Sequence, residues 1–475
     1  MNLLQQHAGL YTDYYELTMA QGYFLSGKHL QKASFDYYYR TNPYKGGYLV
    51  FAGLNDFLQT LKNFKYSSED LNYLASTGLH PEFIEYLRKF EFTGTIHSVR
   101  EGEIVFPNTP IMRVEGNLVE SQIIETLLLN FINFQSLIAT KAFRIKLIAG
   151  DRPFSDFGLR RAQGLGSIQA TRATIIGGAT STSNVYAAKQ YNVPAVGTIA
   201  HAWIQSFGDE LEAFRTYASH NPDNTVLLVD TYDTLKSGIP NAIVVAKELE
   251  AKGYQLKGIR LDSGDLAYLS KRARKMLEAE GLGYVKIMAS NQLNEHVLKS
   301  LNEQGAQLDA FGIGTELVTA KPDAALDGVY KLAECDGEPR MKLSENIEKL
   351  TLPGTKKLVR YYDRAGEFFR DGVLLKDEAT EEVATLYHPH YPHKWTDVSG
   401  LKTEELTQIV YENGEIINPI TSLTEIHDYL MKRSEQLSFE SKRFINPHIY
   451  KVGISKGLQT LKNDLLHQIK PSPCK

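Results

Sequence analysis

Between residues 154 and 315 the sequence repeats one pattern six times: a short apolar run that ends in a glycine or a polar residue, followed by a polar turn. The runs are FSDFG, PAVGTIAH, TVLLVD, KGIRLD, VKIMASN and DAFGIGT. A helical pattern follows most of them, and strands that alternate with helices are typical of a parallel sheet. Parallel strands align their carboxyl ends on one face, so we expect the six endings to converge on one cavity of a β/α barrel.

The 475 residues are too many for one ordinary domain, and three regions differ in pattern. Residues 1–150 mix helical patterns with short aromatic strands, which predicts an N-terminal α+β domain. Residues 151–330 carry the repeat and form the expected catalytic domain. Residues 331–475 return to strand-like runs and end in a mixed, helical extension. We expect these C-terminal strands to rejoin the sheet of the first domain.

Composition disfavours several classes of protein. The chain is 43% hydrophobic and 23% charged, as in soluble globular proteins, and its net charge of -4 gives no basic excess for binding nucleic acid. Cys335 and Cys474 lie far apart and offer neither a disulfide framework nor a thiolate metal cluster. No secretory signal is visible at the N-terminus, and polar residues interrupt the most apolar stretch, 123–139. We expect a cytoplasmic protein without a membrane partner.

A histidine and several acids stand at the predicted strand ends. His201 ends the second run, and a histidine so placed can act as a base or accept a phosphoryl group. Asp230 and Asp262 end the next two runs and can hold the tautomer of that histidine. Together these two acids also suggest a Mg²⁺ site, with the ion bound partly through substrate phosphates. Asp156 ends the first run and is a further candidate.

Other polar residues of these segments have a structural alternative. Asp233 and Asp265 lie past the strand ends, where capping of the next helix is the favoured role. Asn291 ends the fifth run and either lines the pocket or caps the helix that follows. The segment YHPHYPH (387–393) carries three histidines, but its prolines and lack of partners favour a surface loop over a metal site.

Two segments have the composition of anion-binding loops. The adjacent Arg160 and Arg161 follow the first strand and can bind a carboxylate or a phosphate, unless they are solvated at the start of a surface helix. Gly312, Gly314 and Thr315 follow the last strand, where backbone N–H groups and a hydroxyl can close on a phosphate. The combined inventory fits transfer chemistry on a phosphorylated sugar.

Several motifs together resemble the nicotinate phosphoribosyltransferase family. They are LYTDYYELTMAQGYF, FSDFGLRRAQG, GTIAHAW, VDTYD, IRLDSGDL and FGIGTELVT with the later GVYKL, in order from near residue 10 to about 335. The resemblance implies an N-terminal α/β domain, an irregular β/α barrel and a C-terminal extension, in a homodimer with shared active sites. It implies transfer of phosphoribose from 5-phosphoribosyl 1-pyrophosphate to nicotinate, the first step of NAD synthesis from nicotinate. ATP hydrolysis would be coupled through a phosphohistidine, as in a ligase.

The resemblance also implies roles for individual residues. His201 matches the phosphorylated histidine, and Thr198 and Arg260 match contacts to nicotinate. Tyr15 is expected to stack on the pyridine ring, with Tyr14 as the alternative, and Arg40 is a looser candidate for a phosphate contact across the dimer. The remaining carried-over residues are those around the histidine, the ribose or Mg²⁺ and those of the phosphate loop: Asp156, Asp230, Asp262, Gly312, Gly314 and Thr315.

Other activities remain open on the same scaffold. Quinolinate transfer needs extra cations for a second carboxylate, and nicotinamide favours an acid, not a basic residue, against its amide. A barrel isomerase or aldolase uses a lysine or a carboxylate base, and none of the six runs ends in lysine. A binding protein of this fold is expected to have lost several of the cavity groups.

Overall fold

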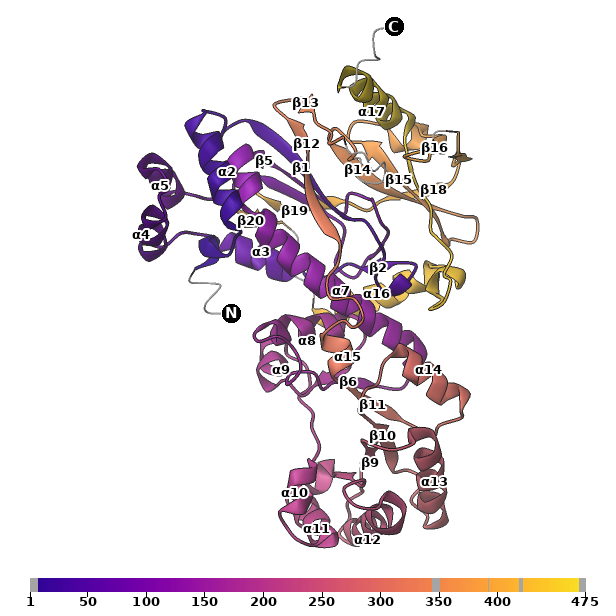
Figure 1. Ribbon diagram of the computed structural model, residues 1–475. Helices are drawn as coiled ribbons and strands as arrows, with labels where there is room; N and C mark the ends of the chain where they lie inside the picture. The colour runs from indigo at the N-terminus through magenta and orange to yellow at the C-terminus, as the bar shows by residue number, and fades with distance from the viewer. Residues whose placement is uncertain (1–6, 344–350, 392, 418–421, 470–475) are drawn as a thin grey trace. The chain divides into compact units, whose positions relative to one another are not determined.

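The computed structural model describes residues 7–343, 351–391, 393–417 and 422–469. The chain forms two compact units, one from residues 1–137 with 325–475 and the other from residues 138–324. The first unit is therefore built from both ends of the chain. Each unit is described by itself below (Figure 1).

The main sheet of the first unit has seven antiparallel strands in the order β13-β12-β1-β5-β3-β19-β20. Its centre consists of aromatic and branched side chains, such as Tyr37 and Val114, that are fully buried. Strands β12 and β19 come from the later part of the chain and pair with β1 and β3. The bounds are β1 (Lys32–Tyr39), β3 (Thr95–Ser98), β5 (Met112–Asn117), β12 (Gly328–Cys335), β13 (Glu338–Pro339), β19 (Gln408–Glu412) and β20 (Glu415–Ile416).

The N-terminal part of this unit contains several helices; α6 packs against β1 and β5 of the sheet, and α2 packs on α6. The stretch Leu118–Ala149 is long and apolar enough to cross a membrane by length and composition, but 72% of its most apolar window is buried within the protein. Most of its side chains are therefore part of the protein core. This agrees with the prediction from its polar residues that the stretch does not span a membrane. The helices are α2 (Tyr14–Leu25), α3 (Leu54–Lys62), α4 (Ser68–Ser76), α5 (Pro81–Arg88), α6 (Leu118–Ile123) and α7 (Glu125–Ala149).

The C-terminal strands are divided between two sheets. The run GVYKLAEC forms β12, whereas KKLVRYYD and EFFRDGVLLKD form β14 and β15 of a separate six-stranded sheet, in the order β17-β16-β21-β15-β14-β18. Among the described residues this unit also has the helices α16 and α17, a small sheet of β2 and β4, and several short 3-10 turns. The bounds are β2 (Leu49–Val50), β4 (Ile104–Val105), β14 (Lys356–Tyr362), β15 (Phe368–Leu375), β16 (Thr385–Tyr387), β17 (Trp395–Asp397), β18 (Lys402–Glu405), β21 (Val452–Ile454), α16 (Leu423–Gln436) and α17 (Lys456–Ile469).

A buried ionic cluster fastens this second sheet to the N-terminal part of the unit. Arg360 on β14 donates to Glu103 at 2.6 Å and to Asp371 on β15 at 2.8 Å, and all three side chains are at most 1% exposed. Arg433 on α16 lies 2.9 Å from the other oxygen of Glu103, and Tyr450 donates to Asp371 at 3.0 Å. Every charge in this cluster thus has a partner of opposite sign, as burial requires.

The second unit contains a six-stranded parallel sheet in the order β7-β6-β11-β10-β9-β8 (Figure 1). Five of the six predicted strands are confirmed. The run PAVGTIAH forms only a single bridge, between Thr182 and Ala195, and β7 was not predicted. The bounds are β6 (Phe154–Asp156), β7 (Ser181–Thr182), β8 (Val226–Leu228), β9 (Gly258–Leu261), β10 (Lys286–Ala289) and β11 (Ala310–Ile313).

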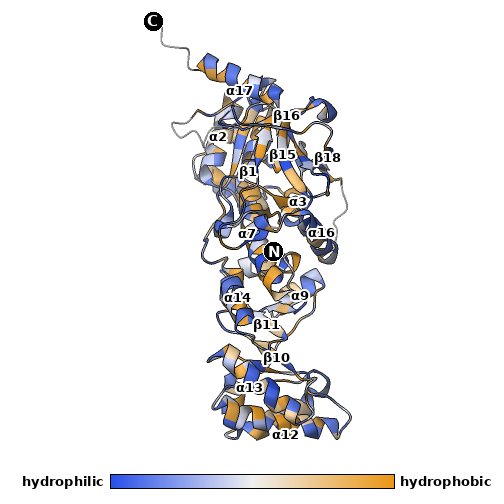
Figure 2. Cartoon of the chain, turned by 90° about the vertical axis from the view of Figure 1, so that its right-hand side faces the viewer, coloured by the Kyte–Doolittle hydropathy of each residue, from blue (hydrophilic) through white to orange (hydrophobic). Residues whose placement is uncertain are grey.

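Within the described residues the strand order of this sheet ends at β7 and at β8, so the structure shows a half-barrel. Helices follow the strands, and Figure 2 shows polar and apolar residues mixed along α12 and α13, as in helices with one buried side. The bounds are α8 (Gly166–Ile176), α9 (Val185–Tyr191), α10 (His201–Gln205), α11 (Glu210–His220), α12 (Ile239–Glu250), α13 (Leu266–Ala279), α14 (Glu295–Glu303) and α15 (Thr315–Val318).

Candidate active site

Arg260 on β9 is the centre of a polar cluster at the strand ends of the second unit. Its Nε donates to Ser290 Oγ at 2.7 Å, Nη1 to Thr198 Oγ1 at 2.8 Å, and Nη2 to Asp262 Oδ1 at 2.8 Å. The guanidinium also lies 5.7 Å from the centre of the Phe157 ring. A guanidinium has five N–H donors, so one remains on each Nη after these three bonds. Two parallel donors are what a carboxylate accepts in a bidentate contact.

Asp262 joins this cluster to the histidine. Its Oδ1 accepts from Arg260 and from Ser290 Oγ, whereas its Oδ2 lies 3.9 Å from His201 Nε2. The other ring nitrogen, Nδ1 of His201, lies 3.1 Å from Thr231 Oγ1. The imidazole is therefore bonded to Thr231 on one side and lies near Asp262 on the other, with 41% of the side chain exposed. The structure thus brings His201 and Asp262 close together, and the roles predicted for them stay predictions.

Asp230 occupies the neighbouring strand end and is bonded on one oxygen only. Its Oδ2 accepts from the backbone N–H of Asp262 at 2.9 Å and from Ser263 Oγ at 2.6 Å. Its Oδ1 is buried without a hydrogen-bond partner. A buried carboxylate oxygen in this state is suited to a cation or to a ligand hydroxyl.

The donor set fits a hard divalent cation in part. Among the described residues, no group of three or more His, Cys, Asp or Glu side chains is arranged to hold a metal ion. Mg²⁺ usually needs only one or two protein carboxylates, because waters and substrate phosphates complete its shell. The free Oδ1 of Asp230 and the Oδ2 of Asp262 meet that smaller requirement.

Asp156 has different surroundings, although it also ends a strand. The side chain is 1% exposed, and it accepts from the Gly158 backbone N–H at 2.8 Å, from Thr171 Oγ1 at 2.7 Å and from Thr182 Oγ1 at 2.9 Å. Burial raises the pKa of this carboxyl, and the three hydrogen bonds oppose that rise. These donors tie β6 to β7 and α8, which is a structural set of contacts.

The predicted anion-binding segments are exposed only in part. Both Arg160 and Arg161 have exposed side chains in the turn after β6. Thr315 is exposed at the start of the four-residue helix α15, with Gly314 just before it. Gly312 is buried, and a Cβ at that position would lie 2.5 Å from the Phe157 ring, so this glycine provides room for packing.

Three alternatives left open by the sequence are resolved locally. The capping role of Asp233 and Asp265 is confirmed, because Asp233 accepts from two N–H groups of the π-helix Thr234–Gly238 and Asp265 accepts from Tyr268 N. The helix after β10 is capped by Asn294, not by Asn291, which is exposed with a left-handed φ of 81°. His388 Nδ1 accepts from the backbone N–H groups of His390 and Tyr391, as in a structured loop.

Tyr15 and Arg40 lie in the first unit. Tyr15 is on the first turn of α2 and is 49% exposed, so its ring is accessible. Arg40 follows β1, and its Nη1 lies 3.4 Å from Asp327 Oδ1, while its Nε is buried without a hydrogen-bond partner. An exposed ring and a partly free guanidinium are compatible with the roles that the resemblance implies.

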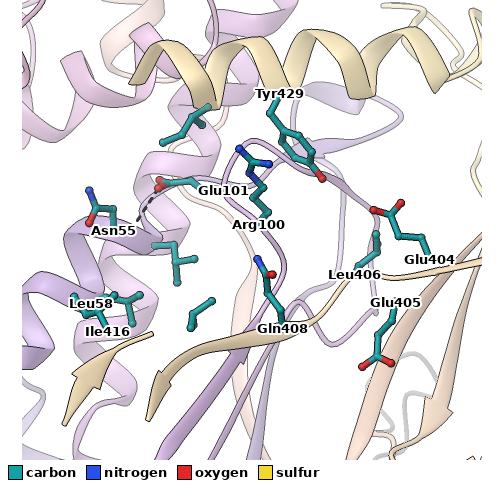
Figure 3. A pocket seen from close by; sticks show the side chains of 13 residues that line it. Asn55, Leu58, Arg100, Glu101, Glu404, Glu405, Leu406, Gln408, Ile416 and Tyr429 are labelled. Carbon is teal, nitrogen blue, oxygen red and sulfur yellow. Dashed lines mark hydrogen bonds between the residues drawn. The ribbon is translucent and has the colours of Figure 1, made fainter. Parts of the chain in front are cut away.

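A separate cavity of about 470 Å³ lies in the first unit, and no predicted site residue lines it (Figure 3). Its walls combine apolar side chains with Arg100, Glu101, Gln408 and Tyr429. The Arg100 guanidinium lies 4.3 Å from the centre of the Tyr429 ring. Cavity size alone therefore does not identify the cluster around Arg260.

Three hydroxyl residues of the cluster were missed in the sequence: Thr231, Ser263 and Ser290. Each lies next to a candidate residue in a strand-end motif. The motifs are VDTYD for Thr231, LDSGD for Ser263 and MASN for Ser290. Their hydroxyls bond His201, Asp230 and Asp262. Thr231 and Ser263 directly follow strand-end acids, which is a signal in the sequence, whereas Ser290 stands beside Asn291 and has no such signal.

Family comparisons match successive parts of the chain. Residues 10–133 match the nicotinate phosphoribosyltransferase (NAPRTase) N-terminal domain. Residues 153–382 match the nicotinate phosphoribosyltransferase (NAPRTase) family, and residues 355–462 match the nicotinate phosphoribosyltransferase C-terminal domain.

Individual proteins are similar over nearly the whole length. Nicotinate phosphoribosyltransferase of Bacillus subtilis (strain 168) is 44% identical over 470 residues, covering 97% of this chain and 96% of that protein. The crystal structure of human nicotinic acid phosphoribosyltransferase superposes with a TM-score of 0.86 at 30% identity, covering 96% of this chain and 99% of that chain. Nicotinate-nucleotide pyrophosphorylase from Pyrococcus furiosus gives a TM-score of 0.71 at 25% identity, covering 90% and 95%.

Proposed function

Because this chain belongs to the nicotinate phosphoribosyltransferase family, we propose that it joins nicotinate to the phosphoribosyl group of 5-phosphoribosyl 1-pyrophosphate, giving nicotinate mononucleotide and pyrophosphate. The observation that carries the assignment of substrate to site is the geometry of Arg260. Two of its N–H donors remain for the nicotinate carboxylate, beside the hydroxyl of Thr198. In the cell this reaction opens the synthesis of NAD from nicotinate.

The chemistry requires one bond to form and one to break. The pyridine nitrogen attacks C1 of the ribose as the bond from C1 to the pyrophosphate oxygen breaks, and pyrophosphate leaves with that electron pair. Positive charge develops on the ribose in the transition state, and the carboxylates of Asp230 and Asp262 can stabilise it. The pyridine nitrogen already carries a lone pair, so the transfer needs no strong base from the protein.

Neutralising the pyrophosphate needs cations. Arg160, Arg161 and the N–H groups near Gly314 and Thr315 are proposed to contact the phosphates. Mg²⁺, when bound by Asp230 and Asp262, would supply charge neutralisation of the leaving pyrophosphate. The unpartnered Oδ1 of Asp230 supports this placement.

His201 is proposed to couple the reaction to ATP. Its exposed ring, held by Thr231 and near Asp262, is suited to accept the γ-phosphoryl group of ATP at a ring nitrogen, with ADP leaving. The added negative charge would reorganise the site, and later hydrolysis would return the free imidazole and phosphate. Incubation with γ-³²P-ATP should label the wild-type enzyme and not His201→Ala. Full ATP stimulation in His201→Ala would contradict this role.

We also propose a cytoplasmic homodimer with shared sites. In such an assembly Tyr15 of the partner subunit would stack on the pyridine ring and Arg40 of the partner subunit would approach a phosphate. The open sheet of the second unit is proposed to be the wall of an irregular barrel that closes past the bridge at Ala195. Sedimentation at micromolar concentration tests the dimer directly.

The substrate assignment is tested by turnover with nicotinate, nicotinamide and quinolinate in parallel, each with 5-phosphoribosyl 1-pyrophosphate. We expect product with nicotinate at a kcat/KM at least about a hundredfold above the other two. The amide of nicotinamide cannot accept a bidentate contact from the Arg260 guanidinium, and the second carboxylate of quinolinate would lack a cation of its own. A preference for quinolinate or nicotinamide would replace the proposed substrate by the corresponding alternative.

A further inference from the structure

The start of α2 is tied to α7 before Tyr15 and to α6 after it. On one side Tyr11 donates to Asn130 Oδ1 at 2.8 Å, and Thr126 Oγ1 donates to the carboxylate of Asp13 at 3.0 Å. On the other side, Glu16 is fully buried, one residue after the half-exposed Tyr15. The exposed ring therefore stands on a turn whose neighbours in sequence are fixed in place.

Glu16 shares its hydrogen-bond donor with a second buried acid, Glu125. Gln122 Nε2 donates to Glu16 Oε2 at 2.6 Å and to Glu125 Oε2 at 2.9 Å, so one amide bridges two carboxyl groups. Glu16 is 0% exposed, Glu125 8% and Gln122 5%. The second oxygen of Glu16 is buried without a hydrogen-bond partner. Two buried acids that share one neutral donor resist carrying two negative charges.

Few other groups offset this charge. From β12, Lys331 Nζ lies 3.9 Å from Glu125 Oε1, and the buried Tyr330 donates its hydroxyl to a backbone oxygen. From α2, Asp13 adds a further negative charge, whereas the Tyr15 hydroxyl interacts with the Glu16 carboxyl and lowers its pKa. Burial is the largest cause that raises the pKa of Glu125, to about 7, followed by the neighbouring Glu16, whose own pKa burial also raises.

We propose that Glu125 is a positioning residue for Tyr15. Through Gln122 and Glu16 it fixes the first turn of α2 in the conformation that binds the pyridine ring. It does so when Glu16 and Glu125 hold one proton between them. When that proton is lost, the carboxylates of Glu16 and Glu125 are both negatively charged and repel each other next to Tyr15. The inference rests on the proposed function, in which Tyr15 contacts nicotinate, and it adds a pH-dependent element to that contact.

The test compares wild type with Glu125→Gln, in which a neutral amide replaces the protonated acid. We expect the wild-type KM for nicotinate to rise about threefold or more between pH 6 and pH 8.5 as the pair ionises. In Glu125→Gln that rise should disappear while kcat stays within about twofold of wild type. Glu120→Gln is the matched control, since Glu120 is another buried acid of the α6–α7 stretch that accepts from Thr93 and Asn117 and lies outside this pair.

A wild-type-like pH dependence of KM in Glu125→Gln would overturn the inference, and so would equal flattening in Glu120→Gln. Thermal unfolding gives a readout that does not need turnover. A carboxyl whose pKa is raised loses its contribution to stability as pH rises from about 4.5 to about 7. Relative to wild type, Glu125→Gln should therefore gain about 2–4 °C in Tm between pH 5 and pH 8. If the Tm of Glu125→Gln does not gain on that of wild type, Glu16 and Glu125 do not share a proton and the inference is wrong. If the Tm gains but the enzyme does not turn over nicotinate, only the proposed substrate is wrong.

Discussion

The acids at the strand ends differ in what surrounds their oxygens. Asp262 faces a guanidinium and a histidine, Asp230 keeps one oxygen free, and Asp156 accepts from three neutral donors. Sequence could place all three at strand ends, because each follows a short apolar run. It could not separate their surroundings, since the donors to Asp156 include Thr171 and Thr182, which only the folded chain brings to it.

Substitutions of Asp156 test whether its carboxylate only accepts structural hydrogen bonds or also contacts the substrate. Asp156→Ala leaves three buried donors without a partner, and we expect it to lower the free energy of unfolding by about 3 kcal/mol or more. Asp156→Asn should recover most of that loss, because the threonine hydroxyls can rotate to accept from the amide. Urea unfolding measures both. If Asp156→Asn is stable yet loses turnover more than about a hundredfold, the carboxylate charge contacts the substrate after all.

Arg260 is expected to be intolerant of even a conservative change. Arg260→Lys keeps the charge but loses the paired donors, and we expect kcat/KM for nicotinate to fall by about 10–100-fold. Steady-state kinetics measures the effect. The matched control is Arg274→Lys, at another partly buried arginine of the same unit, which bonds Asp309 at 2.7 Å and lies outside the cluster. An equal loss in both variants would contradict a specific role for Arg260.

At the scale of elements, the apolar runs predicted the strands well wherever the strand is buried. Strands β9 to β11 have buried residues in most of their positions. PAVGTIAH fails as a strand because Ala195 and Val196 are exposed and pair at one bridge only. Strand β7 consists of two residues, Ser181 and Thr182, which have no apolar pattern for a sequence search to detect. His201 therefore begins a helix and does not end a strand.

The second C-terminal sheet depends on a partner that the sequence does not reveal. Arg360 and Glu103 are 257 positions apart, so their pairing is set by tertiary structure alone. We expect Arg360→Met to lower the free energy of unfolding by about 3–5 kcal/mol, because Asp371 and Glu103 then stay buried with less compensation. Arg215→Met, which breaks an exposed pair with Glu248, should cost less than about 1 kcal/mol. Equal losses in denaturant unfolding would contradict the difference in burial.

At the scale of the whole molecule, length predicted more than one domain, but not which strands would belong to which sheet. The first unit needs residues from both ends of the chain, because β12 pairs with β1 and β19 with β3. Register between such distant strands leaves no local signal in the sequence. The pattern of apolar residues indicates that a strand exists, but which strand it pairs with is determined by packing in the folded core.

A chain that ends at residue 324 should therefore fail to fold as a soluble protein. It retains the whole cluster around Arg260 but leaves β1 and β3 without their outer neighbours. Exposed strand edges template pairing with other chains, so we expect aggregation on expression. Co-expression of residues 325–475 should restore solubility, which fractionation of the lysate measures. A soluble, monomeric 1–324 fragment would contradict the dependence of the first unit on its C-terminal strands.

The pairing of β1 with β12 also has a consequence during synthesis. About 290 residues separate the end of β1 from the start of β12. A ribosome that adds roughly 5–20 residues per second takes on the order of 15 to 60 s to cover that distance. Throughout that interval the nascent chain presents an aromatic strand edge that nothing in its own sequence can yet cover. Because of the order in which the chain emerges, we expect chaperones that shield unpaired strands to bind it during synthesis.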